Sequence, residues 1–365
     1  MNYTELLRDP IKTSGVYVAG GFKPGLTDPR AIRLNANENP FGPSPKAIEA
    51  MTDELHRGQF YPGDVLRAFK AKLAVYAGVT TENLTLYNGS GSAINAMGDL
   101  FLNPEDEVVI SSPTYMQYYD LPGHYGARLV EVPALDGLYT NLEGILGAVT
   151  DKTKIIFICN PNNPTGTLLP RGTLEKFIAK LPKHIICIVD EAYMDWIDEP
   201  DYKSAISLVN DDNNLIVLRT FSKIYGMAGI RMGYAVANTL LSQAIASSAN
   251  IFYSNRIAAA GAMASIADKE FYDKVYLNNK SQREYLTSEM KKMGFDVVPS
   301  QTSFIYFNPH SDNEKIMEEL DARFIFIRRF TDPFLRVSIG RPEQNQAFLD
   351  AIKQIVESIS KAKTA

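Results

Sequence analysis

The chain has 365 residues, and its 37 Lys and Arg residues against 42 Asp and Glu residues give a formal net charge of −5. Because this length is more than one compact core usually holds, we expect two domains. The hydrophobic fraction of 45% and the charged fraction of 22% are ordinary for globular proteins and exclude a disordered or fibrous chain. The mildly acidic balance, with no long basic run, argues against a nucleic-acid scaffold.

The sequence shows no pattern typical of membrane insertion, secretion or metal binding. Its most continuous apolar stretch, residues 257–267, is shorter than the ~20 residues of a membrane helix. The first ten residues lack the pattern of a secretion signal. Cys159 and Cys187 lie in apolar runs and are interpreted as small core side chains in a reducing compartment. The four histidines have no metal-ligand spacing, so we expect a cytoplasmic protein without a metal.

The first two thirds of the chain predict an arm followed by an α/β domain. Residues 1–34 are polar and interrupted by glycine and proline, which predicts an arm with one short helix near residues 3–8. Short strands that are apolar on both faces and alternate with helices then favour a mostly parallel sheet between helices, assigned to residues 35–245. A helix is expected over 171–180, and the strand-like runs are residues 84–87, 108–110, 154–159, 185–189, 215–218 and 233–236.

The last third of the chain has a different pattern. A long helical stretch covers residues 272–293, and a final helix over 344–360 places Phe348, Ile352, Ile355 and Ile359 on one face. Three strand-like runs lie between these helices, at residues 302–307, 324–327 and 335–339. This pattern predicts a smaller α+β domain over residues 246–365.

Polar residues follow four of the predicted strands, where an open α/β sheet binds its ligand. A glycine–serine turn at residues 88–92 opens a helix, whose backbone N–H groups suit a phosphate. It is not a dinucleotide fingerprint, because Ile94 takes the place of the third glycine. Asn160–Gly166, Asp190 and the Arg219–Lys223 segment follow three other strands, and Arg231 comes eight residues after Lys223.

Taken singly, these residues also fit ordinary roles, namely a turn, a helix cap, a solvated lysine and a surface ion pair. Together they match the needs of pyridoxal phosphate. That cofactor requires a lysine for its Schiff base, a carboxylate to keep its pyridine nitrogen protonated, and donors for its ring oxygen and phosphate.

The sequence resembles the fold-type I pyridoxal-phosphate aminotransferases, and within them it looks most like the histidinol-phosphate aminotransferase subfamily. The block around Lys223 is specific for the cofactor, whereas the block that begins at Leu34 points to the subfamily. The resembling segments are residues 34–45, 61–63, 160–166, 190–193, 220–234 and 335–340.

The resemblance implies a role for each matching residue. Lys223 would hold the cofactor covalently, and Asp190 would pair with the pyridine nitrogen. Asn163 and Tyr193 would hydrogen-bond the phenolic ring oxygen, and Tyr115 would stack on the ring unless it is a core tyrosine. The residues that would hold the cofactor phosphate are Ser90, Gly91, Ser222 and Arg231, and Thr220 is also assigned to the cofactor.

Further residues are assigned to the substrate and to a second subunit. Tyr61 resembles a tyrosine that reaches the cofactor phosphate from the neighbouring subunit, which implies a homodimer with shared sites. Arg336 resembles the arginine that clamps the anionic group of the substrate through a planar fork. Asn37 is also assigned to the substrate, and Arg328 is either a second phosphate contact or a solvated side chain.

The mechanism implied is ping-pong transamination. Lys223, displaced by the amino substrate, would move the proton from the α-carbon to the C4′ carbon of the cofactor, and an oxo acid would recharge the cofactor. Two departures from the family concern the substrate. Phe22 stands where the family has a tyrosine, and Gly89–Ser92 lacks the acidic pair that is common in the subfamily.

The leading hypothesis is transamination of a phosphorylated amino alcohol, L-histidinol phosphate, with 2-oxoglutarate as acceptor. One alternative is an aromatic or other amino-acid aminotransferase in which Arg336 holds a carboxylate. Another is a decarboxylase of a phosphorylated amino acid. A pyridoxal-phosphate-dependent regulator is excluded because the sequence has no basic DNA-binding segment. A non-catalytic descendant would be expected to lack Lys223 or Asp190.

Overall fold

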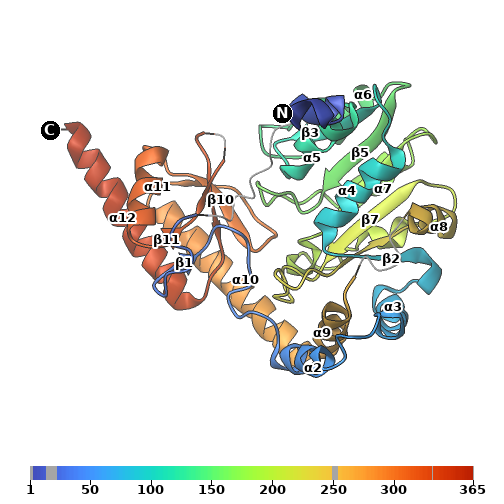
Figure 1. Ribbon diagram of the computed structural model, residues 1–365. Coiled ribbons are helices and arrows are strands. Elements are labelled where there is room, and N and C mark those ends of the chain that lie inside the picture. Colours follow the sequence, from blue (N-terminus) through green and yellow to red (C-terminus); the bar gives the residue numbers. More distant parts are fainter. Residues whose placement is uncertain (1–2, 14–22, 249–253, 331, 365) are drawn as a thin grey trace.

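The computed structural model describes residues 3–13, 23–248, 254–330 and 332–364. Phe22 therefore lies outside the described residues. The chain forms a large part around a seven-stranded sheet and a smaller part around a four-stranded sheet, with helix α10 (Lys269–Lys292) extending between them (Figure 1). The arm contains a 3₁₀ turn, η1 (Tyr3–Leu6), and a short helix, α1 (Asp9–Thr13), where one short helix was predicted.

The seven-stranded sheet is mostly parallel, as predicted. Only β8 runs antiparallel to its two neighbours. All six predicted strands are present, and an edge strand, β4, was missed. In spatial order the strands are β2 (Leu84–Tyr87), β8 (Gly233–Val236), β7 (Leu215–Thr220), β6 (Ile186–Asp190), β5 (Thr153–Cys159), β3 (Glu107–Ser112) and β4 (Arg128–Pro133).

The central strands are apolar throughout because both of their faces are buried. Along β5, Ile155, Phe157 and Cys159 join one core cluster, whereas Ile156 and Ile158 join the cluster on the opposite face. Both cysteines are buried and free, which confirms their assignment to the core. The helices around this sheet are α4 (Ser90–Phe101), α5 (Gln117–Asp120), α6 (Leu142–Gly147), α7 (Thr173–Ile178) and α8 (Thr239–Ser248), and the 3₁₀ turns are η2 (Thr81–Asn83), η3 (Pro122–Tyr125), η4 (Met194–Trp196) and η5 (Ala205–Leu208).

Three helices of the large part, seen at the bottom of Figure 1, pack against one another. Helix α9 (Arg256–Ala267) packs against α2 (Pro45–Leu55) and α3 (Gly63–Ala77). Alanines of α9 lie in the same core cluster as Phe69 and Phe221. This helix follows residue 245 yet packs within the large part, and the predicted boundary at 245/246 stays a prediction.

The smaller part carries its helices on one face of an antiparallel sheet, in the order β12 (Arg328–Arg329), β13 (Leu335–Ser338), β10 (Phe304–Asn308) and β9 (Asp296–Val297). A two-stranded parallel pair, β1 (Ile32–Arg33) and β11 (Ile325–Phe326), joins the arm to it. Helices α10, α11 (Asn313–Ala322) and α12 (Pro342–Thr364) cover one face. The predicted apolar face of the last helix is confirmed, because Phe348, Ile352 and Ile355 are buried.

The other face of this small sheet carries polar side chains. Because Phe304 pairs with Ser338 and Tyr306 with Arg336 in the antiparallel register, these four side chains share one face. Arg336 lies within hydrogen-bond distance of Asn163, which belongs to the large part, so this face is turned towards the large sheet. Of the helices in the described ranges, none has both the length and the apolar character needed to cross a membrane.

Candidate active site

A cavity of about 170 Å³ lies where β5, β6 and β7 end and α4 begins. These strands are parallel neighbours, so the residues that follow them meet at one edge of the sheet. Every predicted cofactor residue except Tyr61 lines this cavity. The lining residues are Ser90, Gly91, Tyr115, Cys159, Asn163, Asp190, Ala192, Tyr193, Thr220, Ser222, Lys223, Ala228 and Arg231.

Lys223 lies in the turn after β7, at the edge of the cavity. Its Nζ donates a long hydrogen bond of 3.4 Å to the carbonyl of Ala36. Three residues later, Gly226 has φ +67°, and a Cβ there would overlap the backbone of Gly42. Glycine is therefore required at this position, because the lysine turn packs directly on the segment that follows the arm.

Asp190 ends β6 and is 3% exposed. One of its oxygens accepts the backbone N–H of Ala192 at 3.0 Å, and the other accepts the hydroxyl of Tyr118 at 2.9 Å. Burial raises the pKa of Asp190, and the hydrogen bonds from Tyr118 and Ala192 and the charge of Lys223 oppose that rise. Asp190 thus presents a buried carboxylate, oriented by two donors, to the cavity.

Tyr118 is a site residue that the sequence reasoning missed. Its ring is fully buried and stacks on Phe157 with a centroid distance of 4.4 Å. Burial and the charge of Asp190 raise the pKa of Tyr118 well above its usual range, so the hydroxyl keeps its proton and donates it to Asp190. It lies in α5, three residues after Tyr115, and nothing in the sequence separates it from a core tyrosine.

The opposite end of the cavity suits an anion. Helix α4 begins at Ser90 after Gly89, which has φ +81° and no side chain to cap the first N–H groups. The guanidinium of Arg231 lies beside this turn, and a Cβ on Gly89 would overlap it. Arg231 donates to the carbonyl of Ala228 at 2.7 Å and to Ser222 Oγ at 3.4 Å. A helix N-terminus, a hydroxyl and a guanidinium therefore converge on one spot.

Two residues of the cavity wall, Asn163 and Tyr193, contact side chains that lie outside the cavity lining. Asn163 accepts a hydrogen bond through Oδ1 from Arg336 at 2.5 Å, which leaves its amide N–H groups for other partners. Tyr193 accepts one from Asn37 Nδ2 at 2.8 Å. Asn37 itself is 2% exposed and lies outside the cavity lining, so its predicted contact with the substrate stays a prediction.

Arg336 and Arg328 lie side by side on the small sheet. They are register partners between β13 and β12, so their side chains share a face. Both guanidinium carbons lie 5.0 Å from the ring centroid of Phe330. Arg336 is buried and donates to the carbonyl of Asn35 at 2.9 Å, whereas Arg328 is half-buried. Asn163 thus links Arg336 to the cavity wall, and Arg328 lies beside Arg336 on the same face of the small sheet.

Tyr61 lies away from the cavity of its own chain. It occupies the link between α2 and α3 and is 79% exposed, beside Phe60 at 61%. The structure therefore does not bring Tyr61 together with the other predicted cofactor residues within one chain.

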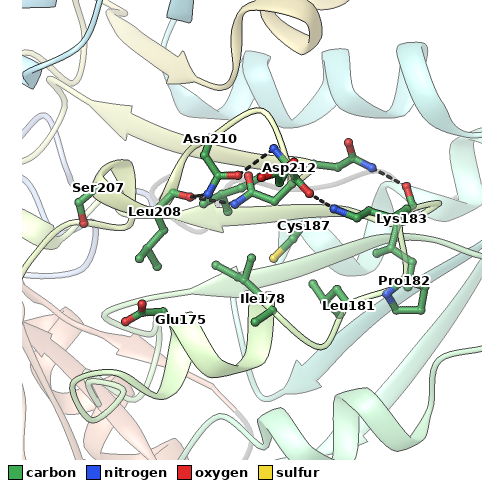
Figure 2. A pocket seen from close by; sticks show the side chains of 15 residues that line it. Glu175, Ile178, Leu181, Pro182, Lys183, Cys187, Ser207, Leu208, Asn210 and Asp212 are labelled. Carbon is green, nitrogen blue, oxygen red and sulfur yellow. Dashed lines mark hydrogen bonds between the residues drawn. The ribbon is translucent and has the colours of Figure 1, made fainter.

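A larger hollow of about 480 Å³ lies between α7 and the loop over residues 207–214, at the ends of β6 and β7 remote from the cavity (Figure 2). Its polar groups mostly hydrogen-bond one another. Lys183 donates to the carbonyl of Asp212, Asn214 donates to the carbonyl of Lys183 at 2.6 Å, and Asn213 donates to the carbonyl of Leu208 at 2.8 Å. These bonds close the loop onto the sheet, and the lining does not pair a buried carboxylate with a lysine as the cavity does.

Comparison with known proteins identifies the family. Residues 29–352 match the family described as "Aminotransferase class I and II". The chain is similar to the histidinol-phosphate aminotransferase of Halalkalibacterium halodurans, with 35% identity over 89% of each chain. It is similar to histidinol-phosphate aminotransferase 1 of Idiomarina loihiensis, with 35% identity over 97% of this chain and 98% of that one.

A solved structure agrees with these sequence matches. The histidinol-phosphate aminotransferase of Sinorhizobium meliloti, in complex with pyridoxal-5′-phosphate, superposes with a TM-score of 0.88 at 27% identity, over 96% of this chain and 98% of that one. The resemblance inferred from the sequence motifs is thereby confirmed, as is the fold-type I architecture. The protein therefore belongs to the class I and II aminotransferase family.

Proposed function

We propose that this aminotransferase uses pyridoxal phosphate to transfer the amino group of L-histidinol phosphate to 2-oxoglutarate. The observation that carries the proposal is the pair Arg328 and Arg336, which share one sheet face and are connected to the cavity wall through the hydrogen bond between Arg336 and Asn163. Two guanidinium groups match a dianionic phosphate better than a single carboxylate. The relatives named histidinol-phosphate aminotransferase support the same choice of donor.

The residues that line the cavity are of the kinds that the cofactor needs at both of its ends. Arg231, Ser222, Thr220 and the start of α4 would hold the phosphate, with Ser90 and Gly91 supplying backbone N–H groups. Tyr115 would cover one face of the ring. When bound, pyridoxal phosphate supplies an electron sink for the α-carbon of the substrate.

The residues of the chain would then perform three tasks. Asp190 would keep a proton on the ring nitrogen, because a buried carboxylate favours the charged pyridinium beside it. Asn163 and Tyr193 would donate hydrogen bonds to the phenolic ring oxygen. Lys223 would hold the cofactor covalently and, once displaced by substrate, its amine would carry the proton from the α-carbon.

Truncation of Arg336 is expected to lower kcat/KM by roughly 10- to 150-fold. This range corresponds to the loss of one charge-assisted hydrogen bond of about 1.5–3 kcal/mol. Arg336→Lys should recover only part of the loss, because an ammonium lacks the planar fork. Arg328→Ala tests whether the amino donor carries a phosphate. If it does, this substitution should weaken the half-reaction with histidinol phosphate much more than the half-reaction with 2-oxoglutarate. Equal, small effects on both half-reactions would favour a plain amino acid as donor.

We also propose a homodimer in which Tyr61 serves the site of the neighbouring subunit. The support is its exposure on the α2–α3 link, away from the cavity of its own chain. A Lys223→Ala protein mixed with a Tyr61→Ala protein, under conditions that allow subunit exchange, should regain part of the activity that each lacks alone. A protein that is fully active as a monomer by light scattering would contradict this prediction.

A half-reaction screen tests the choice of substrate. The purified, cofactor-loaded protein is mixed with one amino donor at a time, and the loss of the near-visible absorption of the bound cofactor is followed. Histidinol phosphate is expected to react, and phenylalanine, tyrosine and phosphothreonine are not. A fast response to phenylalanine or tyrosine, with none to histidinol phosphate, would replace the proposed donor by an amino acid.

A further inference from the structure

We infer that Asn37 is a positioning residue that directs the hydroxyl proton of Tyr193 at the phenolic oxygen of the cofactor, with Ser338 fixing the orientation of the Asn37 amide. This inference rests on the proposed function, because it needs the cofactor in the cavity. It concerns three buried side chains, Asn37 from the segment that follows the arm, Tyr193 from the large part and Ser338 from β13 of the small part, which are 2%, 3% and 2% exposed, respectively.

The direction of each hydrogen bond follows from the donors available. The backbone N–H of Asn37 donates to Ser338 Oγ at 2.9 Å. The Ser338 hydroxyl can then use its own proton to donate to Asn37 Oδ1, which also lies at 2.9 Å. With Oδ1 turned to Ser338, the other end of the amide, Nδ2, faces Tyr193 Oη at 2.8 Å.

The opposite amide orientation is less favourable. Nδ2 would then donate to Ser338 Oγ, which already accepts the backbone N–H, and none of the described contacts of Ser338 would accept its proton. A buried donor without an acceptor costs about 1–3 kcal/mol. The observed orientation gives a partner to the serine proton, to the asparagine oxygen and to one amide hydrogen.

The backbone around Asn37 is held from both sides. The carbonyl of Leu34 accepts a hydrogen bond from the backbone N–H of Ser338 at 2.8 Å. The carbonyl of Asn35 accepts a hydrogen bond from the guanidinium of Arg336. Asn37 has φ +56°, in the left-handed region that asparagine tolerates better than most residues. The ring of Tyr193 is held edge-on to Phe304, with a centroid distance of 5.1 Å.

This arrangement determines where the proton of Tyr193 goes. Because Asn37 donates to Tyr193 Oη, the tyrosine cannot donate its own proton back to that amide nitrogen, and Tyr193 lines the cavity. A hydrogen bond donated to the phenolic oxygen lowers the proton affinity of the cofactor's bond to Lys223. The charged groups around this point are Lys223, whose Nζ lies 5.5 Å from the Tyr193 ring centroid, Asp190, Arg231 and, behind Asn163, Arg336.

The test is a spectrophotometric pH titration of the bound cofactor in a double-mutant cycle. Asn37→Asp keeps the size and the left-handed backbone but replaces the donor by an acceptor, so Tyr193 should donate to residue 37 and not to the cofactor. The midpoint pH of the absorbance change of the bound cofactor is expected to rise by about one to two pH units. This is the equivalent of one hydrogen bond to a charged group. Tyr193→Phe alone should raise it in the same direction.

The double mutant separates the redirected tyrosine proton from the effect of the added negative charge. In the Tyr193→Phe background, Asn37→Asp should shift the midpoint by less than about half of the shift that it causes when Tyr193 is present, because sites coupled through Tyr193 are not additive. Equal shifts in both backgrounds, or no shift with Tyr193 intact, would overturn the inference. Asn37→Gly, which tolerates the positive φ and adds no charge, should raise the midpoint by a smaller amount, and an unchanged midpoint would also overturn it.

Failure of the proposed function gives a different result. If the unmutated protein forms no absorbing complex with pyridoxal phosphate, both the function and the inference are wrong. If Tyr193→Phe shifts the midpoint and Asn37→Asp does not, the function stands and only the role of Asn37 is wrong.

Discussion

Replacement of Lys223 by alanine is expected to abolish the covalent attachment of pyridoxal phosphate and to lower turnover by at least about 10²- to 10⁴-fold, the contribution of a general acid–base group alone. The physical reason is that, in the proposed function, the lysine amine would be both the anchor of the cofactor and the group that carries the substrate proton. The fold should persist, because Lys223 is partly exposed and the described hydrogen bond of its side chain, to the carbonyl of Ala36, is long.

Gel filtration under denaturing conditions would measure this loss. After borohydride reduction, which makes the link between lysine and cofactor permanent, the unmutated protein should keep its cofactor. The Lys223→Ala protein should release it. Lys269→Ala is a matched control, since this side chain is exposed on α10 and pairs with Asp273 at 2.7 Å. Retained attachment in the Lys223 variant, or equal loss of turnover in the Lys269 control, would show that another residue holds the cofactor.

Asp190→Asn is expected to bind the cofactor and to lose roughly 10²- to 10⁴-fold in turnover. Removal of one partner from a buried charge pair typically costs about 3–5 kcal/mol, which corresponds to that range. In the proposed function, the amide should still fit beside the ring but could not stabilise a protonated pyridine, so the electron sink would be weakened. Near-native turnover of this variant, measured with bound cofactor confirmed by absorbance, would mean that Asp190 has only a structural role.

The cofactor-free protein provides an independent test through pH. Because burial raises the pKa of Asp190 in the folded protein, its contribution to stability is present at low pH and is lost as the pH rises through that raised pKa. The asparagine variant does not titrate here. Its free energy of unfolding relative to the unmutated protein should therefore increase between about pH 4, near the usual aspartate value, and neutral pH. Urea unfolding across this range measures the difference, and a constant difference would contradict the raised pKa.

The elements predicted most accurately from the sequence were those buried on both faces. The central strands of the large sheet read as continuous apolar runs, and their ends differ from the predicted ends by no more than two residues. Strand β4 was missed because it lies at the sheet edge, where the exposed side chains of Arg128 and Glu131 interrupt its apolar residues. An edge strand with one solvated side lacks the signal that identified its neighbours.

The convergence of the cavity residues could be predicted because it follows from topology alone. Parallel strands place their carboxyl ends at one edge, so Asn163, Asp190 and Lys223 had to meet there once the strands were assigned. Contacts between distant segments could not be predicted in this way. Asn37 and Ser338 are separated by 301 residues, and their hydrogen bonds depend on how the segment that follows the arm lies against the small sheet.

The partners of Asp190 were also beyond the sequence. Nothing in the residue pattern distinguishes Tyr118 from a core tyrosine, since its role depends on a hydroxyl that comes within 2.9 Å of a carboxylate 72 residues away. Tyr61 is a different case. Its exposure in one chain agrees with a role in a neighbouring subunit, but only a second chain can supply the site that it would complete.

Borohydride reduction of the purified protein, followed by peptide mapping, tests most directly whether the cavity at the ends of β5, β6 and β7 is the catalytic site. Reduction fixes pyridoxal phosphate to the lysine that holds it, and a single labelled peptide containing Lys223 is expected. A label on Lys269 or on any other lysine would contradict the assignment of this cavity, as would an unlabelled Lys223 in protein that retains transaminase activity.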